Sequence, residues 1–382
     1  MMVNNYSRPP CKLLLEALGN YILRNVLPTA LLVAALICVG FYGLGVNEVS
    51  FDSGPHMGSL PWLRWDSFHY LSIAEHGYKA EPCGQFICGN TGWFPLFPWV
   101  IRFFFSLGIS LPWSSLLTTF LSILVASELL SRLINRRWTP FAIACSFLVL
   151  PGGVYQLAAF PVSLTIALDL LSVWLSLGSF VFLSAASGFM AAFAYPSSVI
   201  LSVALAPFLL LRTPLVAASS RSLRLLPVVA PFLGFFTARE WIDHSVSIAS
   251  AYSLTQARYG HSWSLGFNVL RSSIRYLWKN PVFLQTTVVF VLMLLSTVVV
   301  VQHLLAQDSL LGCVFLAMGW SYWILPHLIG DSVSIYRQEA LLAPMFIFAG
   351  SLLPKRIIFL LSIPLLSLSL VMTKLFLLGS LV

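Results

Sequence analysis

The sequence predicts an all-α, multi-pass membrane protein, and three observations support this prediction. Of the 382 residues, 58% are hydrophobic and only 9% are charged, whereas soluble proteins carry about 25% charged residues. Apolar runs of about 20 residues, the length of a helix that crosses a bilayer, recur along the chain. The runs are continuous rather than alternating, which argues against a β-barrel. The composition excludes a soluble enzyme, a nucleic-acid-binding domain and a disordered chain.

The first span is expected at residues 28–46. Arg8, Lys12 and Arg24 precede it. Because cytoplasmic segments carry an excess of Lys and Arg, the N-terminus is expected in the cytoplasm. Residues 47–112 then form a first outer or luminal loop. The formal net charge of +8 is explained by Lys and Arg in cytoplasmic loops rather than by nucleic-acid binding.

The apolar stretch 94–108 contains Pro95 and Pro98 and is short for a span. We therefore expect a helix that lies at the outer interface or dips into it. The second span is then 113–134, and the arginines at its end have a cytoplasmic signature. If 94–108 crossed the membrane, those arginines would face outward.

The chain continues as a single multi-pass domain, 1–382, without an internal repeat. Pro196 lies in the middle of 185–211, which is either one kinked span or two short ones, and the arginines after it favour two. A second outer loop is expected at 237–281, because it is too amphipathic to span. About eleven spans are predicted, with a range of nine to thirteen. Besides the spans already given, they lie at 140–150, 161–180, 225–236, 283–301, 310–328, 340–353 and 357–378.

Acidic residues are scarce, at 13 in the chain, and five of them lie in the first outer loop. The segment 64–78 reads as a short helix that ends at Gly77. At 100° per residue, Asp66, His69, Tyr70 and Ile73 share one face and Glu75 lies opposite. A carboxylate beside a histidine and a tyrosine suits a general base. The alternative is an interfacial helix with aromatic anchors and Asp66 as a first-turn charge.

The same segment carries a family resemblance. It is similar to the PIG-V family, which comprises the GPI mannosyltransferase II enzymes and their bacterial relatives. The strong match covers residues 64–98, with weaker similarity at 151–163 and at Tyr336-Arg337. The residues of the match are Trp65, Asp66, His69, Tyr70, Ile73, Ala74, Glu75, His76, Gly77, Tyr78, Trp93, Phe94, Pro95, Leu96, Phe97 and Pro98. Trp93 stands where the family commonly has Phe.

This resemblance implies a GT-C glycosyltransferase that inverts the anomeric carbon. The sugar, mannose by the resemblance, comes from a polyprenyl- or dolichyl-phosphate donor. It goes to a glycolipid or glycan acceptor, of the GPI-precursor type, on the outer or luminal membrane face. The sugar-phosphate lipid is a co-substrate, and no other cofactor and no metal are expected. His69, His76 and Asp66 are poorly suited to act together as metal ligands.

Asp66 matches the catalytic acidic position of the family, and His69 and Glu75 are further catalytic candidates. Glu75 has an alternative role as the partner of a cation. Arg337 is the candidate cation for the donor phosphate, with Tyr336 beside it, because a guanidinium binds phosphate bidentately. The alternative for Arg337 is a plain interfacial anchor. The candidates for lining the substrate site are Trp65, Tyr70, Tyr78, Phe94, Pro95 and Pro98.

Other residues have local interpretations. Cys83 and Cys88 lie in the first outer loop and form a disulfide if that loop faces an oxidising compartment. Glu128 lies one turn from Arg132 and is expected to pair with it, whereas Asp169 has no sequence-near cation. The chain is shorter than eukaryotic relatives. It also carries an insert at residues 83–91, with Cys83 and Cys88, that is not part of the eukaryotic pattern. Both facts favour a bacterial plasma membrane over an endoplasmic reticulum membrane.

Two other classes of function compete with the enzyme. A lipid or glycan transporter, or flippase, is expected to show mid-span charges and internal symmetry. A non-catalytic scaffold is expected to lose its motif residues. This chain instead concentrates acidic and aromatic residues in one outer loop and retains Asp66, Pro95 and Pro98, which favours the transferase.

Overall fold

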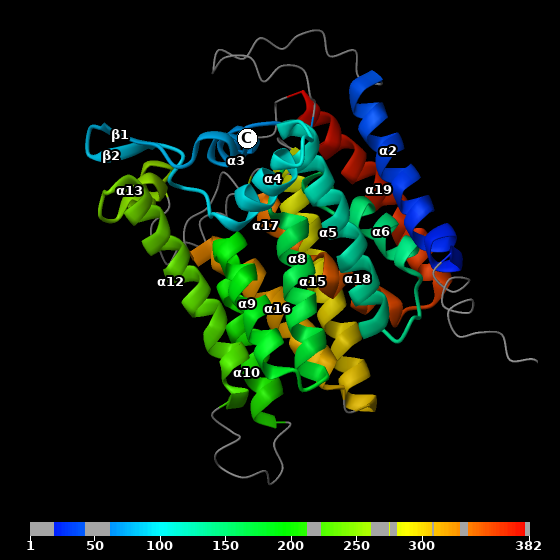
Figure 1. Ribbon diagram of the computed structural model, residues 1–382. Helices are drawn as coiled ribbons and strands as arrows, with labels where there is room; N and C mark the ends of the chain where they lie inside the picture. Colours follow the sequence, from blue (N-terminus) through cyan, green and yellow to red (C-terminus); the bar gives the residue numbers. More distant parts are fainter. Residues whose placement is uncertain are drawn as a thin grey trace, which may run out of the picture.

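Apolar runs of the sequence form helices in the computed structural model of the protein (Figure 1). It describes residues 19–42, 62–211, 223–260, 275, 281–307, 309–328 and 335–378. Within these ranges the only sheet is a two-stranded hairpin. The predicted class, an all-α membrane protein, is confirmed.

The first half of the chain contributes the elements that surround the predicted catalytic loop. In order they are η1 (Ile22–Val26), α2 (Leu27–Tyr42), α3 (Asp66–His76), β1 (Ala80–Cys83), β2 (Phe86–Gly89), α4 (Leu96–Ser106), α5 (Leu111–Leu133), α6 (Pro140–Val149), α7 (Val154–Leu157) and α8 (Val162–Leu177). The second half follows as α9 (Val181–Ala194), η2 (Pro196–Ile200), α10 (Leu201–Leu211), α12 (Leu226–Val246), α13 (Ala251–Arg258), α15 (Pro281–Ala306), α16 (Leu310–Leu328), α17 (Ile335–Glu339), η3 (Ala340–Leu342), α18 (Ala343–Ser351) and α19 (Lys355–Leu377).

Five helices in the described ranges are long and apolar enough to cross a membrane. Their apolar segments are Gly19–Leu36, Leu111–Leu133, Leu284–Ala306, Leu310–Leu328 and Lys355–Leu377. Shorter apolar helices, such as α8 and α9, pack among them. The predicted total of about eleven spans counts these shorter helices as well.

Two segments settle questions that the sequence left open. The stretch 185–211 is broken at Tyr195, where α9 ends and Pro196 starts η2, so two short helices replace one kinked span. Within residues 94–108 the helix is α4, with 11 residues, and its exposed apolar side chains include Trp99, Phe103 and Phe105; its placement at the membrane interface stays a prediction.

Helix α12 is longer than expected. The predicted span ended at residue 236, but the helix continues to Val246 and stops only where Ser247 takes a left-handed conformation, with φ 56°. The charged residues Arg239, Glu240 and Asp243 disfavour the membrane core, but charge does not prevent a helix from continuing into water. Ten residues of the predicted second loop are therefore helical.

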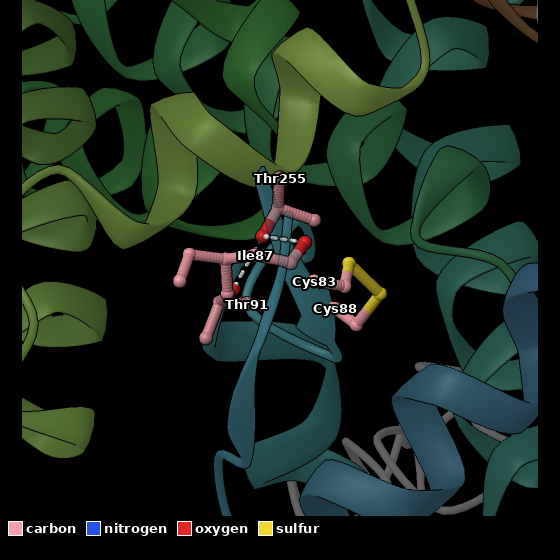
Figure 2. Close-up of a disulfide and its surroundings, with 5 residues drawn as sticks. All are labelled: Cys83, Ile87, Cys88, Thr91 and Thr255. Carbon is pink, nitrogen blue, oxygen red and sulfur yellow. Dashed lines mark hydrogen bonds between the residues drawn. A yellow bond between two sulfur atoms is a disulfide. The ribbon is translucent and has the colours of Figure 1, made fainter. Parts of the chain in front are cut away.

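One end of the bundle carries the short elements. Helices α3 and α4, the hairpin β1–β2 and α13 gather there, with α13 against the hairpin (Figure 1). The predicted disulfide between Cys83 and Cys88 closes the hairpin. The hairpin is fastened to α13 by a 2.6 Å hydrogen bond between the hydroxyls of Thr91 and Thr255 (Figure 2). The described parts of the two predicted loops therefore form one layer.

Close packing of α9 against α12 supports this layer from below. Gly234 of α12 lies so near α9 that an added Cβ would overlap the carbonyl oxygen of Phe189. Serine hydroxyls also join α8 and α9, with Ser176 and Ser184 2.6 Å apart. Small residues and interhelical hydrogen bonds are the usual means of association between membrane helices.

We predict that Gly234→Ala lowers the stability of the purified protein in detergent by about 1–3 kcal/mol, because overpacking forces the two helices apart. Alanine has a higher helix propensity than glycine. A loss of stability would therefore report the contact between α9 and α12 and not a lower propensity for helix. Gly19→Ala is the matched control, since nothing lies within 4 Å of a Cβ at that position. Equal unfolding midpoints for both variants would contradict the close approach.

Candidate active site

The site begins at an unusual backbone turn. Trp65, directly before α3, has φ 45° and ψ −110°, a combination that non-glycine residues rarely adopt and that surrounding contacts must hold. Its ring packs edge-on against Phe376, with centroids 5.3 Å apart. The guanidinium of Arg64 donates to the carbonyl oxygen of Leu377 at 2.9 and 3.3 Å. The end of α19 therefore fixes the point where α3 starts.

Asp66 is the first residue of α3 and forms an ion pair with Arg337 of α17. The two residues are 271 positions apart in the chain. Their side chains are 22% and 15% exposed, so the pair is largely shielded from water. The guanidinium of Arg337 also lies over the ring of Phe160, 5.3 Å from its centroid. The structure thus unites the predicted catalytic carboxylate with the predicted phosphate-binding cation.

Trp93 borders Asp66 on another side. Its indole N–H is near enough to the Asp66 carboxylate to lower the pKa of that group. The ring of His69, one turn along α3, stacks on Trp93 with centroids 3.7 Å apart and planes 16° from parallel. Tyr78 donates to the carbonyl oxygen of Trp93 at 2.8 Å, which holds the tryptophan in place. The aromatic residue that distinguishes this chain from the family pattern is therefore a direct partner of Asp66.

The charges of the site follow from these contacts. Burial alone raises the pKa of Asp66, but the positive charge of Arg337 and the hydrogen bonds from Arg337 and Trp93 lower it below its ordinary value. Burial lowers the pKa of His69. The negative charge of Asp66 opposes this shift, and the positive charge of Arg258 adds to it. At neutral pH the site therefore contains a carboxylate and a neutral imidazole.

Two of the predicted tyrosines are buried structural partners of the ion pair. The ring of Tyr70 packs edge-on against Phe97 and Phe160, with centroids 5.2 and 6.4 Å away. Tyr336 stacks on Tyr155 of α7 at 5.6 Å. They shape the apolar wall behind Asp66 and Arg337.

Other predicted residues lie apart from the ion pair. Glu75 is on the opposite, exposed face of α3, where its carboxylate is 3.4 Å from His76. Phe94 packs with Phe235 and Tyr252 in a second apolar cluster. Pro95 and Pro98 are buried at the start of α4, so they position that helix.

Several residues near the site were missed by sequence reasoning. The amide of Gln338, next to Arg337, donates to the hydroxyl of Tyr195 at 2.9 Å and accepts from Ser197 at 2.8 Å. Glu339 is buried and accepts from Gln285 at 2.7 Å. The available signal was the run Arg337-Gln338-Glu339, three polar residues in succession beside an apolar span.

The acidic residues inside the bundle have separate partners. Glu128 accepts a hydrogen bond from Arg132 at 2.5 Å, as predicted, and another from Tyr21 at 2.9 Å. Asp169 accepts from the hydroxyl of Tyr322 on α16. Within the ranges that the structure covers, no group of three or more His, Cys, Asp or Glu residues could hold a metal ion.

Comparison with known proteins gives one informative result. No protein-family model matches the chain, and no curated protein matches it. Among solved structures, it is similar to the oligosaccharyltransferase of Archaeoglobus fulgidus in its apo form, with a TM-score of 0.51 and 10% sequence identity. The match covers 93% of this chain but only 56% of the archaeal enzyme. At this identity the likeness shows a shared fold.

We predict that Asp66→Ala destabilises the protein by up to about 3–5 kcal/mol at neutral pH, because it leaves the Arg337 guanidinium shielded from water without a counter-charge. Asp66→Leu combined with Arg337→Met should cost less than the single change, and a double-mutant cycle measures the difference. The single variants Asp66→Leu and Arg337→Met complete the double-mutant cycle.

The pH dependence provides an independent check. The pKa of Asp66 is lowered in the folded state, so its stabilising contribution is present above its ordinary pKa of 3.8. This contribution is lost as the pH falls through the folded pKa. The stability gap between wild type and Asp66→Ala should narrow in acid. A gap that stays constant with pH would contradict the ion pair.

Proposed function

We propose that this protein is an inverting glycosyltransferase. It takes a sugar, mannose by its likeness to the PIG-V motif, from a polyprenyl- or dolichyl-phosphate donor to a glycolipid or glycan acceptor at the outer face of the membrane. The observation that carries the proposal is the ion pair between Asp66 and Arg337. It places a carboxylate and a cation suited to phosphate side by side at the end of a membrane bundle. The fold shared with an oligosaccharyltransferase supports it.

The proposed step needs one base and one cation. The Asp66 carboxylate takes the proton of an acceptor hydroxyl while that oxygen forms a bond to the anomeric carbon. The bond between the anomeric carbon and the phosphate oxygen breaks, and its electron pair leaves on the polyprenyl phosphate. The Arg337 guanidinium stabilises the negative charge on this leaving group. Attack from the face opposite the phosphate inverts the configuration.

The resting ion pair suggests how the base is activated. In the structure Arg337 neutralises Asp66, which makes the carboxylate a weak base. A guanidinium carries five N–H donors in a fork, so a donor phosphate can share it with Asp66. The phosphate charge then offsets that of Arg337 and raises the pKa of Asp66 in the complex. The base becomes effective once the sugar donor is bound.

The proposal keeps the lipid-linked sugar as a co-substrate and requires no resident metal. Addition of EDTA to the transfer assay below tests this requirement. It also keeps the assignment to a bacterial plasma membrane, or to the endoplasmic reticulum if the host is eukaryotic, with the site outside or in the lumen.

We predict that the purified wild-type protein transfers label from polyprenyl-phosphate-mannose to a component of a host membrane lipid extract. Asp66→Asn should reduce this rate by at least about 100-fold, the usual range for loss of a general base. Glu81→Gln removes an exposed carboxylate from the same loop and is the matched control with full activity. Mass spectrometry of the product identifies both sugar and acceptor.

Each outcome of the assay has a defined meaning. Transfer that survives Asp66→Asn but not Glu75→Gln would move the base to the opposite face of α3. No transfer by the wild type with mannose, glucose or arabinose donors would contradict the proposed function.

We further predict that Trp93→Phe shifts the acidic limb of the pH–rate profile to higher pH. The indole N–H favours the charged form of Asp66, so its removal raises the pKa of the carboxyl group. Phenylalanine retains a ring for His69 to stack on. Trp99→Phe, at an exposed position of α4, is the control. An unchanged acidic limb of kcat/KM in Trp93→Phe would show that Asp66 does not titrate in the reaction.

A further inference from the structure

The end of α13 lies beside the site, next to Trp93. Tyr259, which follows the last residue of α13, packs its ring edge-on against Trp93, with centroids 6.0 Å apart and planes 79° from parallel. The guanidinium of Arg258 lies 5.8 Å from the centroid of the Tyr259 ring. Its charge is close enough to influence the titration of His69. Two residues from the second predicted loop therefore adjoin the first.

This approach is held by several contacts. The carboxylate of Asp243 accepts hydrogen bonds from the backbone N–H groups of Ser250 and Tyr252, at 2.8 and 3.2 Å, and so secures the turn before α13. The amide of Gln256 donates to the carbonyl oxygen of Gly92 at 2.8 Å, one residue before Trp93. The bond between Thr91 and Thr255 completes the attachment (Figure 2). Trp93 and Tyr259 thus belong to one supported unit.

The charges distinguish the two sides of Asp66. On the buried side, the charge of Arg337 is matched by the carboxylate. On the other side, Arg258 and Tyr259 are exposed, with 41% of Tyr259 accessible, and no carboxylate within the described ranges forms an ion pair with Arg258. Asp66 thus has Arg337 and Trp93 as neighbours, and Trp93 in turn contacts Tyr259.

We propose that Trp93, Arg258 and Tyr259 form the acceptor subsite, which binds a saccharide that carries an anionic substituent such as a phosphate. This inference rests on the proposed function and extends it to the acceptor. The edges and faces of aromatic rings pack against the apolar face of a sugar ring, and a guanidinium binds a phosphate in a bidentate manner. The sugar donor occupies the Arg337 side, and the acceptor hydroxyl meets Asp66 between them.

Binding of small probes tests the subsite without catalysis. The full-length protein in detergent is given mannose 6-phosphate or mannose, and saturation-transfer NMR reports which sugar protons contact the protein. We expect signals from mannose 6-phosphate that fall about tenfold in Arg258→Gln, the usual effect of losing a charged hydrogen bond. Tyr259→Ala should weaken the binding of both sugars. Arg102→Gln, an exposed arginine of α4, is the charge-matched control.

The transfer assay separates this inference from the proposed function. In Arg258→Gln and Tyr259→Ala, the acceptor KM should rise about tenfold, a larger change than that in the KM for polyprenyl-phosphate-mannose. If the two variants bind mannose 6-phosphate as the wild type does, or if the wild type does not bind it, the subsite is wrong. If the wild type binds mannose 6-phosphate through Arg258 but neither transfers nor hydrolyses the donor, the subsite stands and the proposed function fails.

Discussion

The ion pair between Asp66 and Arg337 is the interaction on which the rest of the site depends. Either charge alone would be costly at a position with so little access to water, and the pair removes most of that cost only while both groups stay in register. This requirement explains the surrounding contacts. Arg64 and Trp65 bind the end of α19, and Tyr336 stacks on Tyr155. Each contact holds one of the two helices that carry the charges.

The pair also has two unlike sides. Toward the bundle, Arg337 lies against Phe160, and the wall is apolar and aromatic. Toward the loops, Asp66 is bounded by Trp93, which His69 and Tyr259 flank. The proposed reaction needs such an asymmetry, because its reacting carbon must meet a hydroxyl from one direction and lose a phosphate in the other. One carboxylate with a different neighbour on each side satisfies both demands with few charged residues.

Local periodicity predicted much of the first loop. The spacing of Asp66, His69 and Tyr70 and the stop at Gly77 follow from helical geometry, which also placed Glu75 on the far face. Pro196 marked the break between α9 and η2 because proline lacks an N–H. The partners of these residues had no such signal. The family resemblance pointed to Arg337 and nothing pointed to Tyr259, because both lie far away in sequence and no local rule pairs distant segments. Hydropathy also missed the end of α12, since it measures compatibility with lipid and not helix formation.

The topology of the site follows from two helices that reach it. Helix α5 begins at Leu111, shortly after α4, and ends beside Arg132 and Arg136. Helix α19 begins with Lys355 and Arg356 and ends at Leu377, which binds Arg64. At 1.5 Å per residue, the basic end of α19 lies about 33 Å from the site, the thickness of a hydrocarbon core. The positive-inside tendency then agrees with the outer-face site of the proposed function. The disulfide between Cys83 and Cys88, which persists in oxidising compartments, supports the same side by independent chemistry.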